Sequence, residues 1–105
     1  MKVPKLGETE SQSAPLAVIK LFTPDAGWTW FITEYDGQDT LFGLVVGLET
    51  ELGYFSLAEL RQARGPWGLP IERDLWFTPA LLSQLPEYRA RWGNNGPYRR
   101  GDLHR

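Results

Sequence analysis

The chain contains no cysteine, and this absence removes three classes of protein at once. Without thiols there is no disulfide scaffold, no thiolate zinc site and no cysteine nucleophile. The sequence also lacks an apolar run long enough to cross a membrane, and its first residues lack the basic and then apolar pattern of a signal peptide. We therefore expect a cytoplasmic protein.

Residues for acid-base or nucleotide chemistry are scarce as well. The single histidine, His104, is the penultimate residue, so a catalytic triad or a histidine-ligated metal would require an ordered terminus. No glycine-rich phosphate loop follows a strand pattern. We expect no cofactor, and the inventory favours a non-enzymatic protein over an enzyme.

Positive charge is scarce over most of the chain. Residues 1–88 hold 6 Lys or Arg against 12 Asp or Glu, whereas residues 89–105 hold 5 Arg against one Asp. An acidic body argues against a domain that wraps a phosphate backbone. Nucleic-acid binding is therefore expected only through the tail, where the candidate residues are Arg89, Arg91, Arg99 and Arg100.

The length of 105 residues, with 42% hydrophobic residues, fits one domain around one core. Residues 1–14 are polar and without periodicity, and they predict an irregular N-terminal arm in which Leu6 is the only anchor. Residues 15–88 carry the periodic patterns of the domain. Residues 89–105 predict a basic, flexible tail.

Apolar alternation predicts an antiparallel meander over residues 16–55, with the most apolar stretch, 41–48, as its central strand. Asp36-Gly37 predicts a type I′ hairpin before that strand. In the preceding strand, strict alternation places Glu34 on the same face as Trp28 and Trp30. Glycine inside a strand indicates a close neighbour, so we expect one of these indole rings to cover Gly43 or Gly47.

Two short helices complete the predicted fold. Ser56 and Glu59 form a capping box that predicts a helix over 57–63, and Thr78-Pro79 predicts a second helix over 79–85 that ends at Pro86. Between them, alternation over 71–77 predicts a fifth strand. The sequence therefore predicts a single α+β domain with an antiparallel sheet of about five strands.

Several motifs occur in one order along the chain: Phe22-Thr23-Pro24-Asp25, Trp28-Thr29-Trp30, Glu34-Tyr35-Asp36-Gly37, Phe42-Gly43-Leu44-Val45, Glu51-Leu52-Gly53-Tyr54-Phe55 and Gly68-Leu69-Pro70-Ile71-Glu72-Arg73-Asp74-Leu75. Together they resemble the family of small bacterial, plasmid and phage proteins catalogued as domain of unknown function 2958. The resemblance runs from about Pro4 to the second predicted helix. It implies that the N-terminal arm is native and that the gene belongs to a mobile genetic element, and it supplies no substrate, cofactor or catalytic residue.

The stretch 64–70 contains two glycines and two prolines and must be a loop. A rigid loop can present an aromatic anchor, so we expect a partner protein to bind there. The candidate residues are Trp67, Arg64, Leu69 and Arg73. Alternatively, Trp67 folds back to cap the core, and Arg73 forms a structural ion pair with Glu34 or Glu51.

Carboxylates at the hairpin end offer the alternative function. Glu34, Asp36 and Asp39 surround one turn, and oxygen ligands brought together there could hold Mg²⁺ or Ca²⁺ in a metal-dependent enzyme. Solvated turn carboxylates are the simpler interpretation. The function favoured by the sequence is a small, non-enzymatic protein-interaction module, which we expect to be accessory cargo of a mobile element. The metal-dependent enzyme and weak nucleic-acid binding through the tail are the alternatives.

Overall fold

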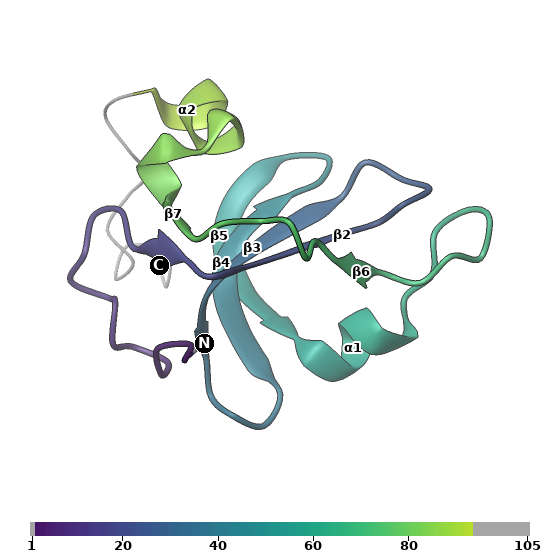
Figure 1. Ribbon diagram of the computed structural model, residues 1–105, viewed down its shortest axis with the longest axis horizontal. Helices are drawn as coiled ribbons and strands as arrows, with labels where there is room; N and C mark the ends of the chain where they lie inside the picture. The colour runs from purple at the N-terminus through teal and green to yellow at the C-terminus, as the bar shows by residue number, and fades with distance from the viewer. Residues whose placement is uncertain (1, 94–105) are drawn as a thin grey trace.

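The chain folds around a five-stranded antiparallel sheet, in a computed structural model that describes residues 2–93. The strands lie in the order β5-β4-β3-β2-β6 (Figure 1). Their bounds are β2 Ile19–Phe22, β3 Thr29–Tyr35, β4 Thr40–Val46, β5 Thr50–Ser56 and β6 Glu72–Arg73. The other elements are β1 Leu16–Ala17, α1 Leu57–Gln62, β7 Ala80–Leu81, the 3-10 helix η1 Leu82–Gln84 and α2 Pro86–Trp92. The predicted α+β class is confirmed.

The predicted meander is confirmed from β2 to β5, where each strand pairs antiparallel with the next. The turn between β3 and β4 is not the predicted type I′ hairpin, because Asp36 does not have a positive φ, although Gly37 does (84°). Instead, Asp36 Oδ1 accepts hydrogen bonds from three successive backbone N–H groups, those of Gln38, Asp39 and Thr40. The aspartate side chain thus closes a longer turn.

A β-bulge at Thr33 changes which residues share a face of β3. The pairing of β3 with β4 shifts register between Ile32 and Glu34, and Thr33 Oγ1 donates to the carbonyl of Phe42 (3.1 Å). Glu34 consequently lies opposite Phe42, on the face that carries Phe31. The prediction that Glu34 shares a face with Trp28 and Trp30 is therefore wrong, because the extra residue reverses the alternation.

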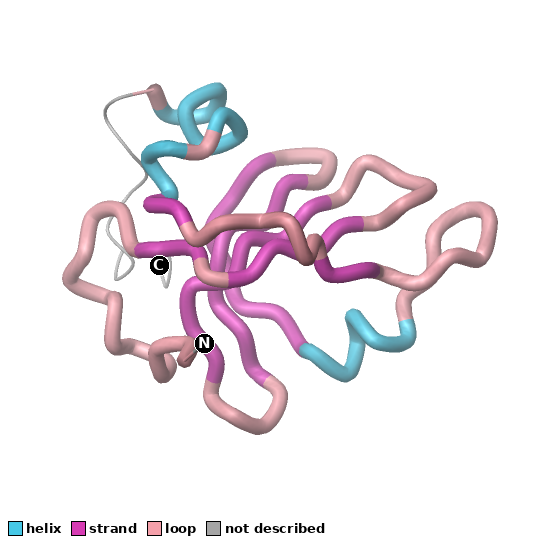
Figure 2. Tube along the Cα trace, in the orientation of Figure 1, coloured by secondary structure: helices cyan, strands magenta, loops and turns pink. Residues whose placement is uncertain are grey.

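Each face of the sheet carries its own buried cluster. On one face, Phe31 and Leu44 pack with η1 and α2; the cluster comprises Ala17, Phe31, Leu44, Leu82, Leu85 and Tyr88. On the other face, α1 packs through Leu60 against Trp30, Ile32 and Leu41. Figure 2 shows the two helical segments at opposite sides of the strands. Burial on both faces explains why β3 and β4 carry apolar side chains on both of their faces.

Both glycines of the stretch 41–48, Gly43 in β4 and Gly47 just after it, have a close neighbour, as predicted. A Cβ atom at Gly47 would overlap the ring of Trp28, which stacks on Trp30 with 6.0 Å between ring centroids. At Gly43 the close neighbour is the carbonyl group of Phe31, beside the bulge. Glycine at both positions is therefore set by a close approach, from Phe31 of β3 at Gly43 and from Trp28, just before β3, at Gly47.

The chain after β6 departs most from the sequence-based prediction. The strand expected over 71–77 is only Glu72–Arg73, and the helix expected over 79–85 is replaced by β7 and η1, with β7 paired to β1. Pro86 begins a helix, at the first position of α2, where proline needs no N–H partner. Thr78-Pro79 is therefore no helix cap, and Arg89 and Arg91 belong to α2.

Tyr88 fastens α2 to the sheet. Its side chain is buried, and its ring lies 4.9 Å from that of Trp92, which also packs on the cluster around Phe31. Burial raises the pKa of the Tyr88 phenol above its usual value. The predicted flexible tail, which was placed at 89–105, therefore cannot begin before Gly93.

The N-terminal arm is irregular, as predicted, but Leu6 is not its only anchor. Val3 packs on the cluster around Trp30, and the carbonyl of Pro4 accepts a hydrogen bond from Tyr35 N–H (2.9 Å). Thr9 is buried. The arm therefore runs beside the last residues of β3.

Within residues 2–93, the helices are all too short or too polar to cross a membrane.

Candidate interaction surface

The loop from Arg64 to Pro70 connects α1 to β6 and forms a small closed structure. Arg64 and Pro70 make an antiparallel bridge, and Gly65 N–H donates to the Leu69 carbonyl (3.0 Å). Gly68 N–H donates back to the Gly65 carbonyl (2.9 Å), and the positive φ of Gly68 (81°) permits the reversal. Its own backbone hydrogen bonds therefore define the conformation of the loop.

Asp25, on the turn between β2 and β3, fastens this loop to the sheet. Its Oδ2 accepts from Trp67 N–H (2.8 Å) and from Leu69 N–H (3.4 Å) across more than forty residues of sequence. A Cβ atom at Gly65 would overlap the Asp25 carboxylate, so the glycine makes room for it. Asp25 Oδ1 is buried there without a hydrogen-bond partner. The carboxylate therefore holds the backbone of Trp67 in one place.

The Trp67 side chain itself points into solvent. Its exposed fraction is 85%, so the indole does not cap the core, which was the alternative interpretation of this residue. Leu69 on the same loop is 41% exposed. A fixed backbone thus presents a large unburied aromatic ring.

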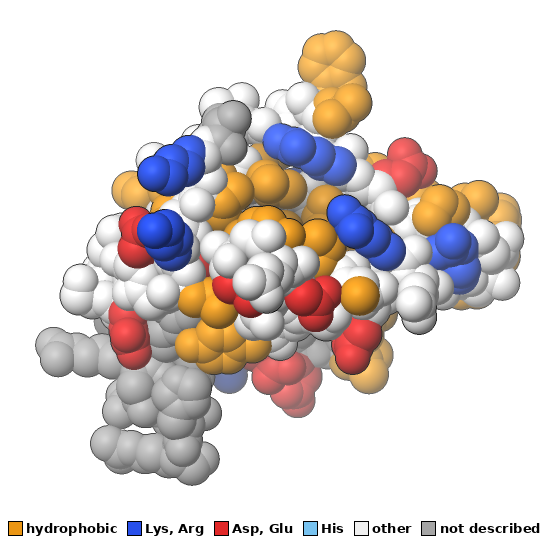
Figure 3. Space-filling view, turned by 90° about the horizontal axis from the view of Figure 1, so that it is seen from below, with side chains coloured by type: hydrophobic (Ala, Val, Ile, Leu, Met, Phe, Trp, Pro, Cys, Tyr) orange, Lys and Arg blue, Asp and Glu red, His pale blue; other side chains and the backbone are white. Residues whose placement is uncertain are grey.

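The two arginines predicted for this surface are also exposed. Arg64 Nη1 donates to the carbonyls of Arg61 (3.0 Å) and Ala63 (2.7 Å), which holds the guanidinium at the C-terminal end of α1. Arg73 lies on β6, opposite Leu21 of β2. The salt bridge at this edge joins Lys20 to Asp74 (3.6 Å), and among residues 2–93 Arg73 forms no salt bridge with Glu34 or Glu51. Figure 3 shows hydrophobic and basic side chains side by side at the right-hand end, which the loop forms.

Asp36 and Asp39 use their oxygens to organise the backbone. Asp39 Oδ1 accepts from Ala58 N–H (2.8 Å) and Oδ2 from Ser56 Oγ (2.7 Å), so the hairpin end holds the start of α1. The Ala58 hydrogen bond, followed by that of Ser56, lowers the pKa of Asp39. The backbone N–H of Gln38 has the same effect on the pKa of Asp36. Ser56 is the N-cap of α1, as its sequence position predicts.

Glu34 is separated from these two aspartates by its own interactions. Its side chain is fully buried, and Oε1 accepts from Gly7 N–H (2.7 Å). Oε2 accepts from both the N–H (2.9 Å) and the hydroxyl of Thr9. Across residues 2–93, no three acidic or histidine side chains come together as metal ligands. The three carboxylates of the predicted metal site therefore have structural partners.

The arginines of the predicted nucleic-acid tail divide between two regions. Arg89 and Arg91 are exposed on α2, and Arg91 lies over the ring of Trp92 at 5.3 Å from its centroid. Arg99 and Arg100 lie outside the described residues.

Comparison with known proteins identifies a family. The profile described as "Protein of unknown function (DUF2958)" matches residues 4–95. The chain belongs to the DUF2958 family. No curated protein and no solved structure matches it. The resemblance drawn from the sequence motifs is confirmed, and the matched region includes the arm from residue 4 onward, the Trp67 loop and α2.

Two features of this DUF2958 protein escape prediction from the sequence. Leu75 and Trp76 are 81% and 94% exposed, although the alternating pattern over 71–77 placed Leu75 on an apolar strand face. Asp25 carried only a turn motif, Thr23-Pro24-Asp25, and its contact with the Trp67 loop depends on the tertiary fold. The Gly and Pro residues of 64–70 indicated a rigid loop and gave no indication of the contact with Asp25.

Proposed function

We propose that this DUF2958 protein is a small, non-enzymatic interaction module that binds another protein through the Trp67 loop. The observation that carries the proposal is the 85% exposed indole on a backbone fastened by Asp25. Exposed tryptophans seated in a partner's pocket are frequent hot spots of binding, and a preformed loop loses little conformational entropy on association.

Leu69, Arg64 and Arg73 extend the proposed surface around the ring. Leu69 adds apolar area on the same loop, and the two guanidinium groups supply donors at its margins. Arginine is enriched with tryptophan in interface centres because it combines a flat apolar stem with several fixed donors. A cytoplasmic location and carriage by a phage or plasmid form part of the same proposal.

The alternatives receive no specific support. The carboxylates that a metal-dependent enzyme would use already accept hydrogen bonds from backbone N–H and hydroxyl groups. Of the four arginines proposed to bind nucleic acid, two lie on α2 of an acidic domain. A thermal stabilisation by Mg²⁺, Mn²⁺ or Ca²⁺ that is abolished by Asp36→Asn would favour the enzyme. Loss of nucleic-acid binding on replacing the tail arginines would favour the third function.

The proposal is tested by affinity capture from the native host, followed by titration of the purified partner. Trp67→Ala should leave the melting temperature unchanged, because the ring is exposed, and should weaken the complex by at least about 30-fold. Leu48→Ala is the matched control, since Leu48 is 94% exposed in the turn after β4. If Trp67→Ala and Leu48→Ala bind equally well, the Trp67 loop is not the interface.

A further inference from the structure

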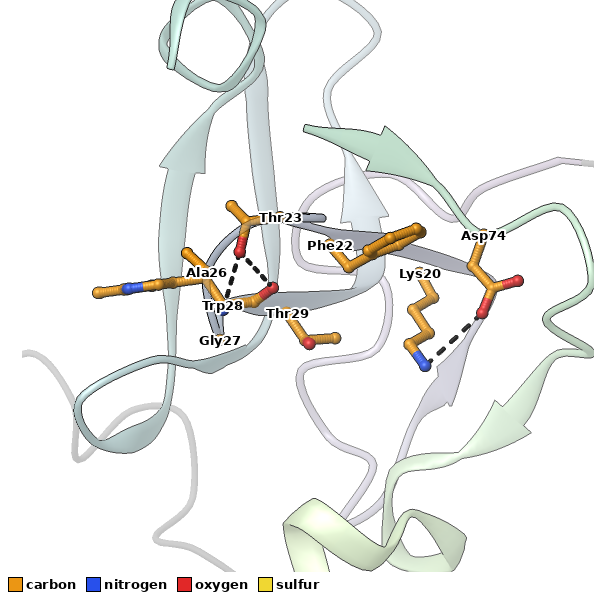
Figure 4. Close-up of a pocket in the computed structure, with 8 residues that line it drawn as sticks. All are labelled: Lys20, Phe22, Thr23, Ala26, Gly27, Trp28, Thr29 and Asp74. Atoms are coloured by element: carbon orange, nitrogen blue, oxygen red, sulfur yellow. Dashed lines mark hydrogen bonds and ion pairs between the residues drawn. The ribbon is translucent and has the colours of Figure 1, made fainter. Parts of the chain in front are cut away.

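The two edges of the five-stranded sheet differ in how they are protected. β6 ends the sheet on one side, where it is two residues long and is followed by the Lys20–Asp74 salt bridge (Figure 4). β5 ends the sheet on the other side with seven residues, and it has no lysine, no proline and no register shift along its ladder with β4. Short length, lysine, proline and bulges are the usual devices that prevent a further strand from pairing with an edge. β5 lacks all four.

The ladder between β4 and β5 shows which backbone groups of β5 point outward. Gly47 N–H donates to the Glu49 carbonyl (3.0 Å) just beyond one end, and Leu57 N–H donates to the Asp39 carbonyl (2.8 Å) just beyond the other. Opposite residues in an antiparallel ladder alternate between hydrogen-bonded and non-hydrogen-bonded pairs. In this register the odd-numbered residues of β5 bond to β4. The even-numbered residues therefore direct their N–H and C=O groups away from it.

Thr50 and Leu52 are the even-numbered residues nearest the turn between β4 and β5. Among residues 2–93, no strand lies beside β5 on this side, so the N–H and C=O groups of both residues face outward without a backbone partner. An extended chain presents donors and acceptors at the same two-residue spacing, and addition of such a chain to a sheet edge is a recurring mode of peptide recognition. The edge is therefore suited to an extended segment.

Two carboxylates give this edge an acidic character. Glu49 and Glu51 are exposed, and the salt bridge among residues 2–93 is Lys20–Asp74, so neither glutamate has a basic partner there. Glu51 lies opposite Val45, which packs on the cluster around Trp30, whereas α2 packs on the other face of the sheet. The arginines of α2 therefore lie on the face away from Glu51.

We propose that β5 binds an extended segment of a partner protein as a sixth, antiparallel strand, and that this segment carries lysine or arginine opposite Glu51. Opposite charges on neighbouring strands stabilise their pairing, and Glu51 would occupy a non-hydrogen-bonded pair, where side chains approach most closely. The next residue of the segment lies opposite Leu52, which packs on the cluster around Phe31, so an apolar side chain fits there. The expected segment alternates basic and apolar residues.

A second copy of this chain fits the edge poorly. Two β5 strands paired antiparallel across Thr50 and Leu52 would bring the Glu51 carboxylates of both copies together, and like charges placed opposite each other destabilise a strand pair. A basic segment removes this repulsion. The Trp67 loop leads into β6, at the other end of the strand order, so the β5 site is independent of the proposed binding through Trp67.

Random peptides of about ten residues, displayed on phage and selected on the full chain, supply the probe. Selected peptides should alternate apolar residues with lysine or arginine. Glu51→Lys should weaken their binding at least about 5-fold, because it replaces an attraction by a repulsion, and should leave the melting temperature unchanged. Glu72→Lys is the matched control, since Glu72 is an exposed glutamate on the other edge strand, and it should bind normally. Equal binding by the two variants overturns the proposal. If wild type selects no peptide but the full-length variant with Arg99→Glu and Arg100→Glu does, the proposal is overturned in favour of residues 94–105 as the occupant.

The backbone pairing is tested by N-methylating one selected peptide, one residue at a time. Only alternate peptide N–H groups face β5, so methylation should weaken binding at least about 10-fold at every second position and have little effect between them. Hydrogen exchange followed by NMR should show new protection at the Thr50 and Leu52 amides. The Glu51 and Gly53 amides, which the ladder directs toward β4, should change little. A response to methylation without this alternation, or no new protection at Thr50 and Leu52, overturns the proposal.

Discussion

Replacing Glu34 by glutamine tests whether the buried carboxylate fastens the N-terminal arm to the sheet. Glutamine has the same shape, but one of its two terminal atoms is a donor. Whichever way the amide is turned, its NH₂ group faces a backbone N–H, that of Gly7 or that of Thr9. At least one of these N–H groups, the partly buried one of Gly7 or the buried one of Thr9, then loses its acceptor, and the hydrogen bonds that remain lose their charge.

The magnitude follows from these losses. An unsatisfied buried N–H costs about 1–3 kcal/mol, and each remaining bond weakens by about 1 kcal/mol when its acceptor becomes neutral. We expect Glu34→Gln to lower the free energy of unfolding by about 2–4 kcal/mol. In urea, with a slope of about 1–3 kcal/mol per molar, the midpoint should fall by about 1 M or more.

The assay is urea unfolding at neutral pH, followed by tryptophan fluorescence. Glu51→Gln is the matched control, because Glu51 is an exposed glutamate on β5 and should change stability little. Thr9→Val removes the hydroxyl donor to Glu34, so the double variant should cost less than the sum of the two single changes. A loss below about 1 kcal/mol for Glu34→Gln, or strict additivity with Thr9→Val, would refute the coupling between Glu34 and the arm.

Three further predictions concern the sheet, the C-terminal helix and acid stability. Gly47→Val should cost about 1–3 kcal/mol, because Trp28 occupies the space above Gly47; an unchanged melting temperature would contradict this. Truncation after Glu87 should sharply destabilise the protein, because it removes the buried Tyr88, whereas truncation after Gly93 keeps the whole of α2; equal stability of the two truncations would show that α2 is dispensable. Hydrogen bonds lower the pKa values of Asp36 and Asp39 in the folded protein. The two carboxylates therefore stabilise the fold fully above the unfolded pKa of about 4, and this contribution is lost as the pH falls through the lower folded pKa values. Asp39→Asn should make the melting temperature fall less steeply in a pH series of thermal melts.

The sequence predicted which residues form the candidate surface, but it left open whether the Trp67 ring is buried or exposed. Glycine and proline mark 64–70 as a loop from the sequence, because neither residue continues a helix or a strand ladder. Asp25, which lies 42 residues away, fixes the backbone of Trp67, and the exposure of the ring is a property of the folded chain. The Leu75-Trp76 turn was not predicted because the alternating pattern continues over 71–77, although only Glu72–Arg73 form a strand, β6.

The sequence alone determined the elements whose causes are local. The β2–β5 meander follows from alternating apolar residues, the start of α1 from the Ser56 hydroxyl, and the glycine at position 47 from the Trp28 ring beside it. Tertiary structure decided the rest. One extra residue at Thr33 turned Glu34 toward Thr9, 25 residues away, and β1 drew residues 80–81 into a strand pair instead of a helix. Local helix and strand propensities differ by only a few tenths of a kcal/mol per residue. Contacts between distant segments therefore outweigh them.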